Sequence, residues 1–150
     1  MYYEGFLVSA RRHKYTCEII KEQMEGLPEG SEQYMRLVSN FYYISGYILE
    51  CSLKYLILES YGHPEKANVD LQSCTALGFG KHNKFFIHDL ADLQNKLAAK
   101  TSEFTSRSDN ESINNLIDSW GPEFRYEIIN SPIEEIKMFY SHAATFIAKI

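Results

Sequence analysis

The segment of the chain with the clearest capacity for chemistry is the run WGPEFRY, which begins at Trp120 and ends at Tyr126. It places an indole, a guanidinium and a phenol on a connection between two predicted helices, where side chains tend to serve binding rather than packing. Arg125 can hold a carboxylate or a phosphate through two parallel hydrogen bonds. The structural alternative is that Arg125 pairs with Glu50 or Glu123 and fixes the connection to the fold.

A second group of polar and aromatic residues shares one face of a predicted long helix: Tyr43, Gly46, Tyr47, Glu50 and Lys54. Glu50 precedes Lys54 by four residues, the orientation that favours an ion pair along a helix. A glycine at position 46 costs about 1 kcal/mol relative to alanine. Its presence indicates close approach of another helix or of a ligand.

Other chemistries lack a specific pattern. The histidines stand at positions 13, 63, 82, 88 and 142, without the helical spacing of a zinc or di-iron site. No GxSxG or cysteine motif is present, and GFGK at 78–81 is only a fragment of a glycine-rich turn. We therefore expect no metal, no cofactor and no catalytic residue. The candidate ligand-binding residues are Arg125, Tyr126, Lys54, Glu50, Tyr47, His88 and Trp120.

Length, composition and charge narrow the class of protein. The 150 residues predict a single domain over positions 1–150, and an apolar fraction of 45% predicts a packed core. The net charge of −5 and a single short basic cluster, Arg11 to Lys14, argue against a protein that coats nucleic acid. A small pocket for one nucleotide or one RNA strand remains compatible with this charge. The eleven tyrosines suit either ordinary core positions or a partner interface.

The cysteines and the N-terminus predict a cytoplasmic protein. Cys17, Cys51 and Cys74 are odd in number and widely spaced, which favours reduced thiols over a disulfide framework. The first residues, MYYEGFLVSARRHK, carry their charge on the wrong side of the apolar run for a signal peptide. The nearly apolar stretch from 41 to 58 contains Glu50 and Lys54, which argues against a membrane span.

Hydrophobic periodicity predicts helices throughout. Positions 4–24 form a first helix, the run GLPEGS a turn, and positions 31–61 a second helix of roughly 45 Å. One stripe of this second helix is expected to face the core: Tyr34, Leu37, Val38, Phe41, Ile44, Ile48, Cys51, Tyr55 and Leu58. The two helices are predicted to form an antiparallel hairpin.

Three further helices are expected after a long connection. Positions 62–80 show no convincing period, and we interpret them as a functional or mobile loop. Asn83 is expected to cap the third helix. Capping boxes are expected where Ser108 precedes Glu111 and where Ser131 precedes Pro132 and Glu134. The predicted fold class is all-α, a five-helix up-and-down antiparallel bundle.

Three short motifs give the chain a family resemblance. They are ECSLKYL from Glu50, the HNK and HDL runs within 82–90, and WGPEFRY from Trp120. In this order, on a helical bundle, they resemble the HEPN superfamily of small helical domains (higher eukaryote and prokaryote nucleotide-binding domains). The resemblance covers residues from about 31 to 150.

The resemblance implies a dimer and two classes of function. Catalytic HEPN domains are metal-independent ribonucleases of toxin–antitoxin, CRISPR and abortive-infection systems, and they use an Arg followed after four to six residues by a His. Here Asn130, Ser131 and Pro132 occupy the positions for that His after Arg125. The members without this pair, which carry an Arg-Tyr like Arg125 and Tyr126, are thought to bind nucleotides or to accompany a nucleotidyltransferase.

Three hypotheses follow. The first is a non-catalytic HEPN-like homodimer that binds a nucleotide or a partner protein such as a nucleotidyltransferase. The second is a ribonuclease toxin with a variant site, in which His88 or His82 acts with Arg125. The third is a structural module in which the tyrosine-rich face of the second helix forms a homodimer seam.

Overall fold

A computed structural model describes residues 1–150 as an all-helical protein with no strand. In chain order its elements are α1 (Glu4–Glu25), α2 (Glu32–Ser60), α3 (Leu71–Ala76), α4 (Leu90–Ala98), α5 (Glu111–Ser119), the 3₁₀ helix η1 (Pro122–Tyr126) and α6 (Ile133–Ile147). The predicted all-α class is confirmed. The expected count of five helices was too low, because α3 was not foreseen.

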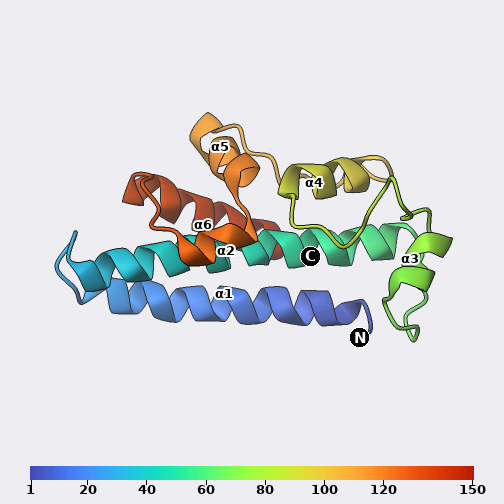
Figure 1. Ribbon diagram of the computed structural model, residues 1–150, viewed down its shortest axis with the longest axis horizontal. Helices are drawn as coiled ribbons and strands as arrows, with labels where there is room; N and C mark the ends of the chain where they lie inside the picture. The colour runs from blue at the N-terminus through green and yellow to red at the C-terminus, as the bar shows by residue number, and fades with distance from the viewer.

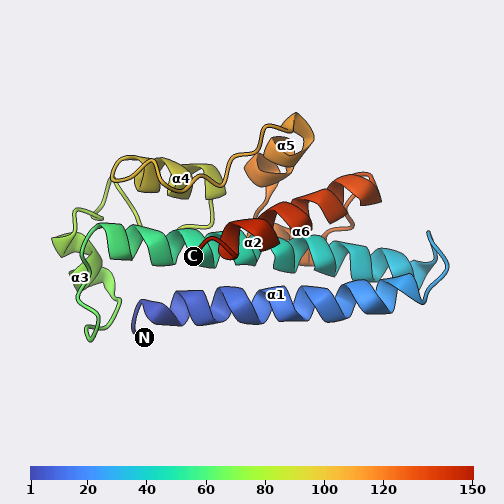
Figure 2. The ribbon, with the colours of Figure 1, turned by 180° about the vertical axis from the view of Figure 1, so that it is seen from behind.

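The two long helices form the predicted antiparallel hairpin. α1 and α2 lie side by side along most of their length (Figures 1 and 2). The connection turns through Gly30, whose φ of 79° is a conformation that side-chain-bearing residues rarely adopt. Ser31 then caps α2 by accepting the backbone N–H of Tyr34 at 3.2 Å. The boundaries of both helices agree with the sequence analysis to within about a turn.

α2 is the axis of the core and is buried on more than the predicted stripe. α1 covers one of its sides, and α4, α6 and η1 contact it elsewhere (Figure 1). Tyr42, Leu49 and Leu53, which lie outside the expected stripe, are fully buried. The division of α2 into a core face and a polar face was therefore too simple. A helix surrounded by neighbours needs apolar residues around most of its circumference.

The stretch from 62 to 80 contains a short helix rather than an irregular loop. Asp70 caps α3 by accepting the backbone N–H of Ser73, and the hydroxyl of Ser73 accepts the backbone N–H of Asp70. With six residues, α3 is too short for a hydrophobic period to be visible in the sequence. Its position next to the N-terminus is fixed by a bond from the Val69 N–H to the Met1 carbonyl, 2.8 Å long.

The predicted caps of the later helices were wrong. α4 begins at Leu90 with Asp89 as its cap, and the amide of Asn83 instead donates to the Gly78 carbonyl. α5 is capped by Asn110, and the Ser108 hydroxyl accepts the N–H of that residue. At α6 the cap position is Pro132, without a side-chain bond. Each of these regions contains several small polar residues that can cap a helix, so residue type alone did not identify the capping position.

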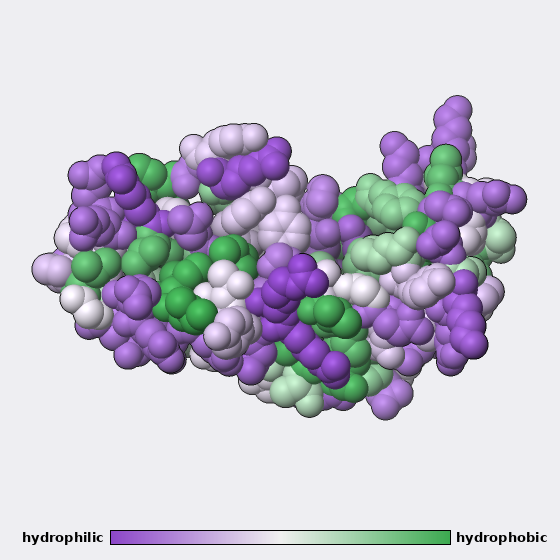
Figure 3. All heavy atoms as spheres, turned by 90° about the horizontal axis from the view of Figure 1, so that it is seen from below, coloured by the Kyte–Doolittle hydropathy of each residue, from purple (hydrophilic) through white to green (hydrophobic).

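α4, α5 and η1 lie on the side of α2 away from α1, whereas α6 packs against α2 and also contacts α1 (Figures 1 and 2). The outer face of α1 presents apolar patches among polar side chains when the molecule is seen from the α1 side (Figure 3). No helix is both long enough and apolar enough to cross a membrane.

Candidate functional site

The contact between α2 and the segment before η1 depends on a glycine. The indole of Trp120 lies against Gly46 so closely that a Cβ atom there would be 2.0 Å from the indole nitrogen. That nitrogen donates a hydrogen bond of 3.1 Å to the Tyr43 carbonyl. Trp120 is buried, so its main contribution is to the core. The prediction that the side chains of this connection serve binding rather than packing was therefore wrong for Trp120. Gly46 does permit a close approach, but by the side chain of Trp120 rather than by the helix or ligand that was expected.

Tyr47 is the point where several candidate residues meet. Its ring packs edge-on against Trp120 with centroids 4.9 Å apart and against His88 with centroids 6.4 Å apart. On the other side the His13 ring of α1 lies 5.4 Å away. The Tyr47 hydroxyl is 3.2 Å from that of Tyr43. One side chain of α2 therefore joins α1, the segment before α4 and the segment before η1.

The electrostatics around Tyr47 reflect this packing. Burial raises the pKa of Tyr47 above its ordinary range, and the Tyr43 bond and the charge of Glu50 act in the same direction. The positive charge of Arg125 opposes them, so its field reaches the Tyr47 hydroxyl. Burial also lowers the pKa of His13, with a further lowering by Arg12. The charge of Glu50 acts against these two effects, and the net lowering favours the neutral imidazole of His13.

Glu50, Lys54 and His88 form a connected group. The Lys54 ammonium donates to one Glu50 oxygen at 2.7 Å, and His88 Nδ1 lies 2.9 Å from the other oxygen. The side chains of Glu50 and Lys54 are 5% and 7% exposed, whereas that of His88 is 50% exposed. The ion pair predicted from the four-residue spacing is present. Both of its charges are matched inside the protein, so the pair is not available to bind an ion from solution.

Arg125 stands apart from this group. It is exposed, and no carboxylate lies within 4.0 Å of its guanidinium. The alternative in which Arg125 pairs with Glu50 or Glu123 is therefore wrong. Its guanidinium carbon lies 4.7 Å from the centre of the Tyr126 ring, a cation–π contact. Tyr126 is 79% exposed, so Arg125 and Tyr126 form a cationic and aromatic projection into solvent.

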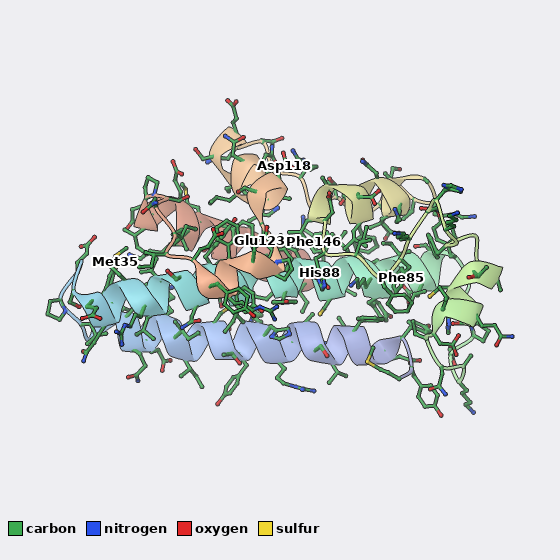
Figure 4. The ribbon with its side chains drawn as sticks, viewed as in Figure 1. Met35, Phe85, His88, Asp118, Glu123 and Phe146 are labelled. Atoms are coloured by element: carbon green, nitrogen blue, oxygen red, sulfur yellow. The ribbon has the colours of Figure 1, made fainter.

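A polar pocket of about 270 Å³ adjoins η1 and the start of α4. Its walls include His88, Asp118, Trp120 and Glu123, and Figure 4 shows His88 and Glu123 near the middle of α2 with Asp118 beyond them on α5. Arg107 holds Asp118 through two hydrogen bonds and keeps the pKa of that carboxyl below its usual value. Glu123 has no such partner. Asp89, also on the wall, has no ion-pair partner and caps α4 through one of its oxygens. The pocket thus offers an imidazole and two carboxylates without an ion-pair partner, those of Asp89 and Glu123.

The structure brings Tyr47, Glu50, Lys54, His88 and Trp120 into one contiguous cluster, with Arg125 close enough to influence it and Tyr126 directed away. Sequence reasoning missed His13 and Asp118 as neighbours of this cluster. His13 had been grouped with the basic residues beside it, and nothing local distinguishes Asp118 from other surface carboxylates.

The donors present do not form a metal site, because no three His, Cys, Asp or Glu side chains come together in a suitable arrangement. The three cysteines are buried and unpaired. Comparisons of the chain with protein-family models, with curated proteins and with solved structures give no match.

Proposed function

We propose that the protein is a non-catalytic, HEPN-like binding domain and that it holds a nucleotide at the surface formed by Arg125, Tyr126 and the adjoining polar pocket. The observation that carries this proposal is the state of Arg125. It is an exposed guanidinium without a carboxylate partner, next to a cluster whose other charges are matched internally.

Arg125 suits the phosphate of such a ligand. A guanidinium presents parallel donors that match two phosphate oxygens, and the bond is charge-assisted on both sides. The contact with the Tyr126 ring restricts the guanidinium plane before any ligand arrives. A donor that is already oriented loses less conformational entropy on binding.

The polar pocket suits the rest of the ligand. Ribose hydroxyls and base amino groups are donors, and Glu123 and the exposed imidazole of His88 can accept from them. Asp118 is neutralised by Arg107, so the pocket repels a phosphate less than its three acidic wall residues, Asp89, Asp118 and Glu123, would suggest. Glu123 and Arg125 lie two residues apart in η1, so the cation is within one turn of a residue of the pocket wall, although Arg125 does not itself line the pocket.

Isothermal titration against a panel of mono-, di- and triphosphate nucleotides tests this proposal. Arg125→Ala should weaken binding by about tenfold or more, the value of one charged hydrogen-bonded contact. Lys66→Ala removes one exposed positive charge from the connection before α3 and serves as the matched control. If the folded protein binds no nucleotide but binds a nucleotidyltransferase, the ligand of this surface is a partner protein and not a nucleotide.

A second function, acid–base cleavage of RNA, is favoured by the bond between Glu50 and His88. A buried carboxylate that holds His88 Nδ1 fixes the tautomer and leaves Nε2 free to accept a proton. Together with Arg125 as an anion-binding group, this is a variant of the ribonuclease arrangement. The parent protein should cleave a single-stranded RNA, and His88→Gln should abolish this cleavage. Absence of cleavage by the parent protein would rule this function out.

The homodimer expected from the resemblance is also a proposal. Tyr47 is covered by His13, His88 and Trp120 within one chain, so the tyrosine-rich face of α2 is a poor seam. The outer face of α1 fits better. Val8, Tyr15 and Ile19 are exposed there at spacings that place them on one side of the helix.

A further inference from the structure

A groove of about 380 Å³ lies at the α3 end of the molecule, away from η1. It is bordered by α3 and by the segment from Phe79 to Phe86. None of its residues takes part in the Arg125 site, so whatever it binds is independent of the function proposed above.

The floor of this groove is aromatic and firmly packed. Phe79 and Phe85 are each 1% exposed, and their ring centroids are 5.6 Å apart. Tyr61 supports Phe79 from behind at 4.7 Å. Phe85 also lies 5.9 Å from the Lys54 ammonium, on the α2 side (Figure 4). A floor held from several sides keeps its shape when a ligand arrives, which lowers the cost of binding.

The edges of the groove expose apolar groups to water. Leu71 is 70% exposed and Phe86 is 52% exposed, and both line the groove. Both are among the most exposed large apolar residues of the chain. An apolar chain placed between them would remove their surfaces from water, and each square ångström buried stabilises the complex by about 25 cal/mol.

Two lysines at the same groove have no internal partner. Lys81 and Lys84 are among the residues that line it, and neither ammonium has a carboxylate within 4.0 Å. Neither ammonium donates a hydrogen bond within the protein, unlike that of Lys54. Two free positive charges beside an apolar hollow are complementary to a molecule with an apolar body and an anionic end.

We propose that this groove binds a small hydrophobic carboxylate. The apolar body lies on Phe79 and Phe85 between Leu71 and Phe86, and the carboxylate is held by Lys81 and Lys84. The volume falls within the range of about 300–1,000 Å³ that is usual for small-molecule sites. A flat anionic membrane is a poorer occupant, because the apolar floor is recessed and the protein as a whole carries a net charge of −5.

Calorimetric titration with octanoate, and with octan-1-ol as its uncharged counterpart, tests the proposal. The parent protein should bind octanoate saturably at one site and bind octan-1-ol more weakly. The double variant Lys81→Ala/Lys84→Ala should lose about tenfold in affinity for octanoate and keep its affinity for octan-1-ol. Lys66→Ala, an exposed lysine outside the groove, should change neither value.

A second variant addresses the apolar half of the site. Leu71→Ser alters an exposed residue and should leave the circular dichroism spectrum unchanged while it weakens both ligands. The proposal is overturned if folded parent protein binds no octanoate, or if the double lysine variant binds it as tightly as the parent. Binding to anionic phosphatidylserine vesicles without saturable binding of octanoate would also overturn it and would assign the patch to a membrane surface.

Discussion

At the scale of single residues, the interior of the protein holds a buried carboxylate whose partners are both supplied by the fold. Glu50 has two such partners, Lys54 from its own helix and His88 from a segment 38 residues away. A buried pair of this kind stabilises the fold little relative to apolar residues of the same size, but loss of one partner leaves the other charge uncompensated. The effect of a substitution on the stability of the protein therefore depends on which residue of the pair is replaced.

Replacement of Glu50 by glutamine should lower the free energy of unfolding by about 3 kcal/mol or more, because the Lys54 ammonium would stay buried without a counter-charge. The double variant Glu50→Gln/Lys54→Met should recover much of this loss. Glu32→Gln, which breaks the exposed pair with Arg36 on the same helix, should cost less than about 1 kcal/mol. Urea denaturation measures all three, and equal losses for Glu50→Gln and Glu32→Gln would contradict the account.

The burial of Tyr42 predicts that the stability of the folded protein depends on pH in the alkaline range. Burial raises the pKa of this phenol from its ordinary 10.0 to about 12, and its hydroxyl donates to the Leu116 carbonyl at 2.7 Å. The folded state keeps the proton when the unfolded state has already released it. The contribution of Tyr42 is therefore complete below pH 10.0 and is lost as the pH rises towards about 12.

The measurement is urea denaturation of parent and Tyr42→Phe at neutral and alkaline pH. At pH 7 the variant should be less stable by about 1–2 kcal/mol, because the Leu116 carbonyl loses its donor. The difference should shrink between pH 10.0 and about 12, since phenylalanine has no proton to lose. Tyr126→Phe, at an exposed ring, should match the parent throughout. A difference between Tyr42→Phe and the parent that stays constant with pH would argue against the assigned burial.

At the scale of elements, the position of η1 depends on the contact between Gly46 and Trp120. Gly46→Ala would improve the helix propensity of α2 by about 1 kcal/mol. The added methyl group would nevertheless overlap the indole, at 2.0 Å from the indole nitrogen. We expect a net loss of about 1–3 kcal/mol, the usual cost of overpacking, with a red shift of the Trp120 fluorescence.

Gly5→Ala is the matched control for this substitution. The new methyl group would meet only the side chain of Met1, at 2.8 Å, and the flexible end of that side chain can move aside. The variant should be as stable as the parent or slightly more stable. Unchanged stability and fluorescence in Gly46→Ala would show that Trp120 does not dock where we place it.

The same elements show what the sequence could predict. α1, α2 and the Glu50–Lys54 pair follow from local spacing, and local spacing is visible in one chain. The contacts of Glu50 with His88 and of Tyr47 with His13 and Trp120 join distant segments, which no local pattern specifies. Residue type alone does not locate a cap: Asp89 and Asn110 have side chains as suitable as those of Asn83 and Ser108, and they are the residues that cap α4 and α5. At α6 the residue after Ser131, Pro132, takes the cap position without a side-chain bond.

At the scale of the whole molecule, three surfaces remain for partners: the Arg125 projection with its pocket, the groove beside α3 and the outer face of α1. They lie on different parts of the fold, so they can be tested separately. Sedimentation at micromolar protein concentration tests whether the outer face of α1 pairs two copies of the chain. The α1 pairing predicts a dimer that Tyr15→Asp converts to a monomer, and a parent protein that sediments as a monomer would rule it out.

The central claim is that Arg125 serves a ligand and contributes little to the fold. The most direct measurement combines urea denaturation and nucleotide titration of Arg125→Ala with those of Lys66→Ala. Because Arg125 has no ion-pair partner, its removal should change the free energy of unfolding by less than about 0.5 kcal/mol. Nucleotide affinity should fall by about tenfold or more in Arg125→Ala and stay unchanged in Lys66→Ala. Unchanged nucleotide affinity in a folded Arg125→Ala protein would contradict the account.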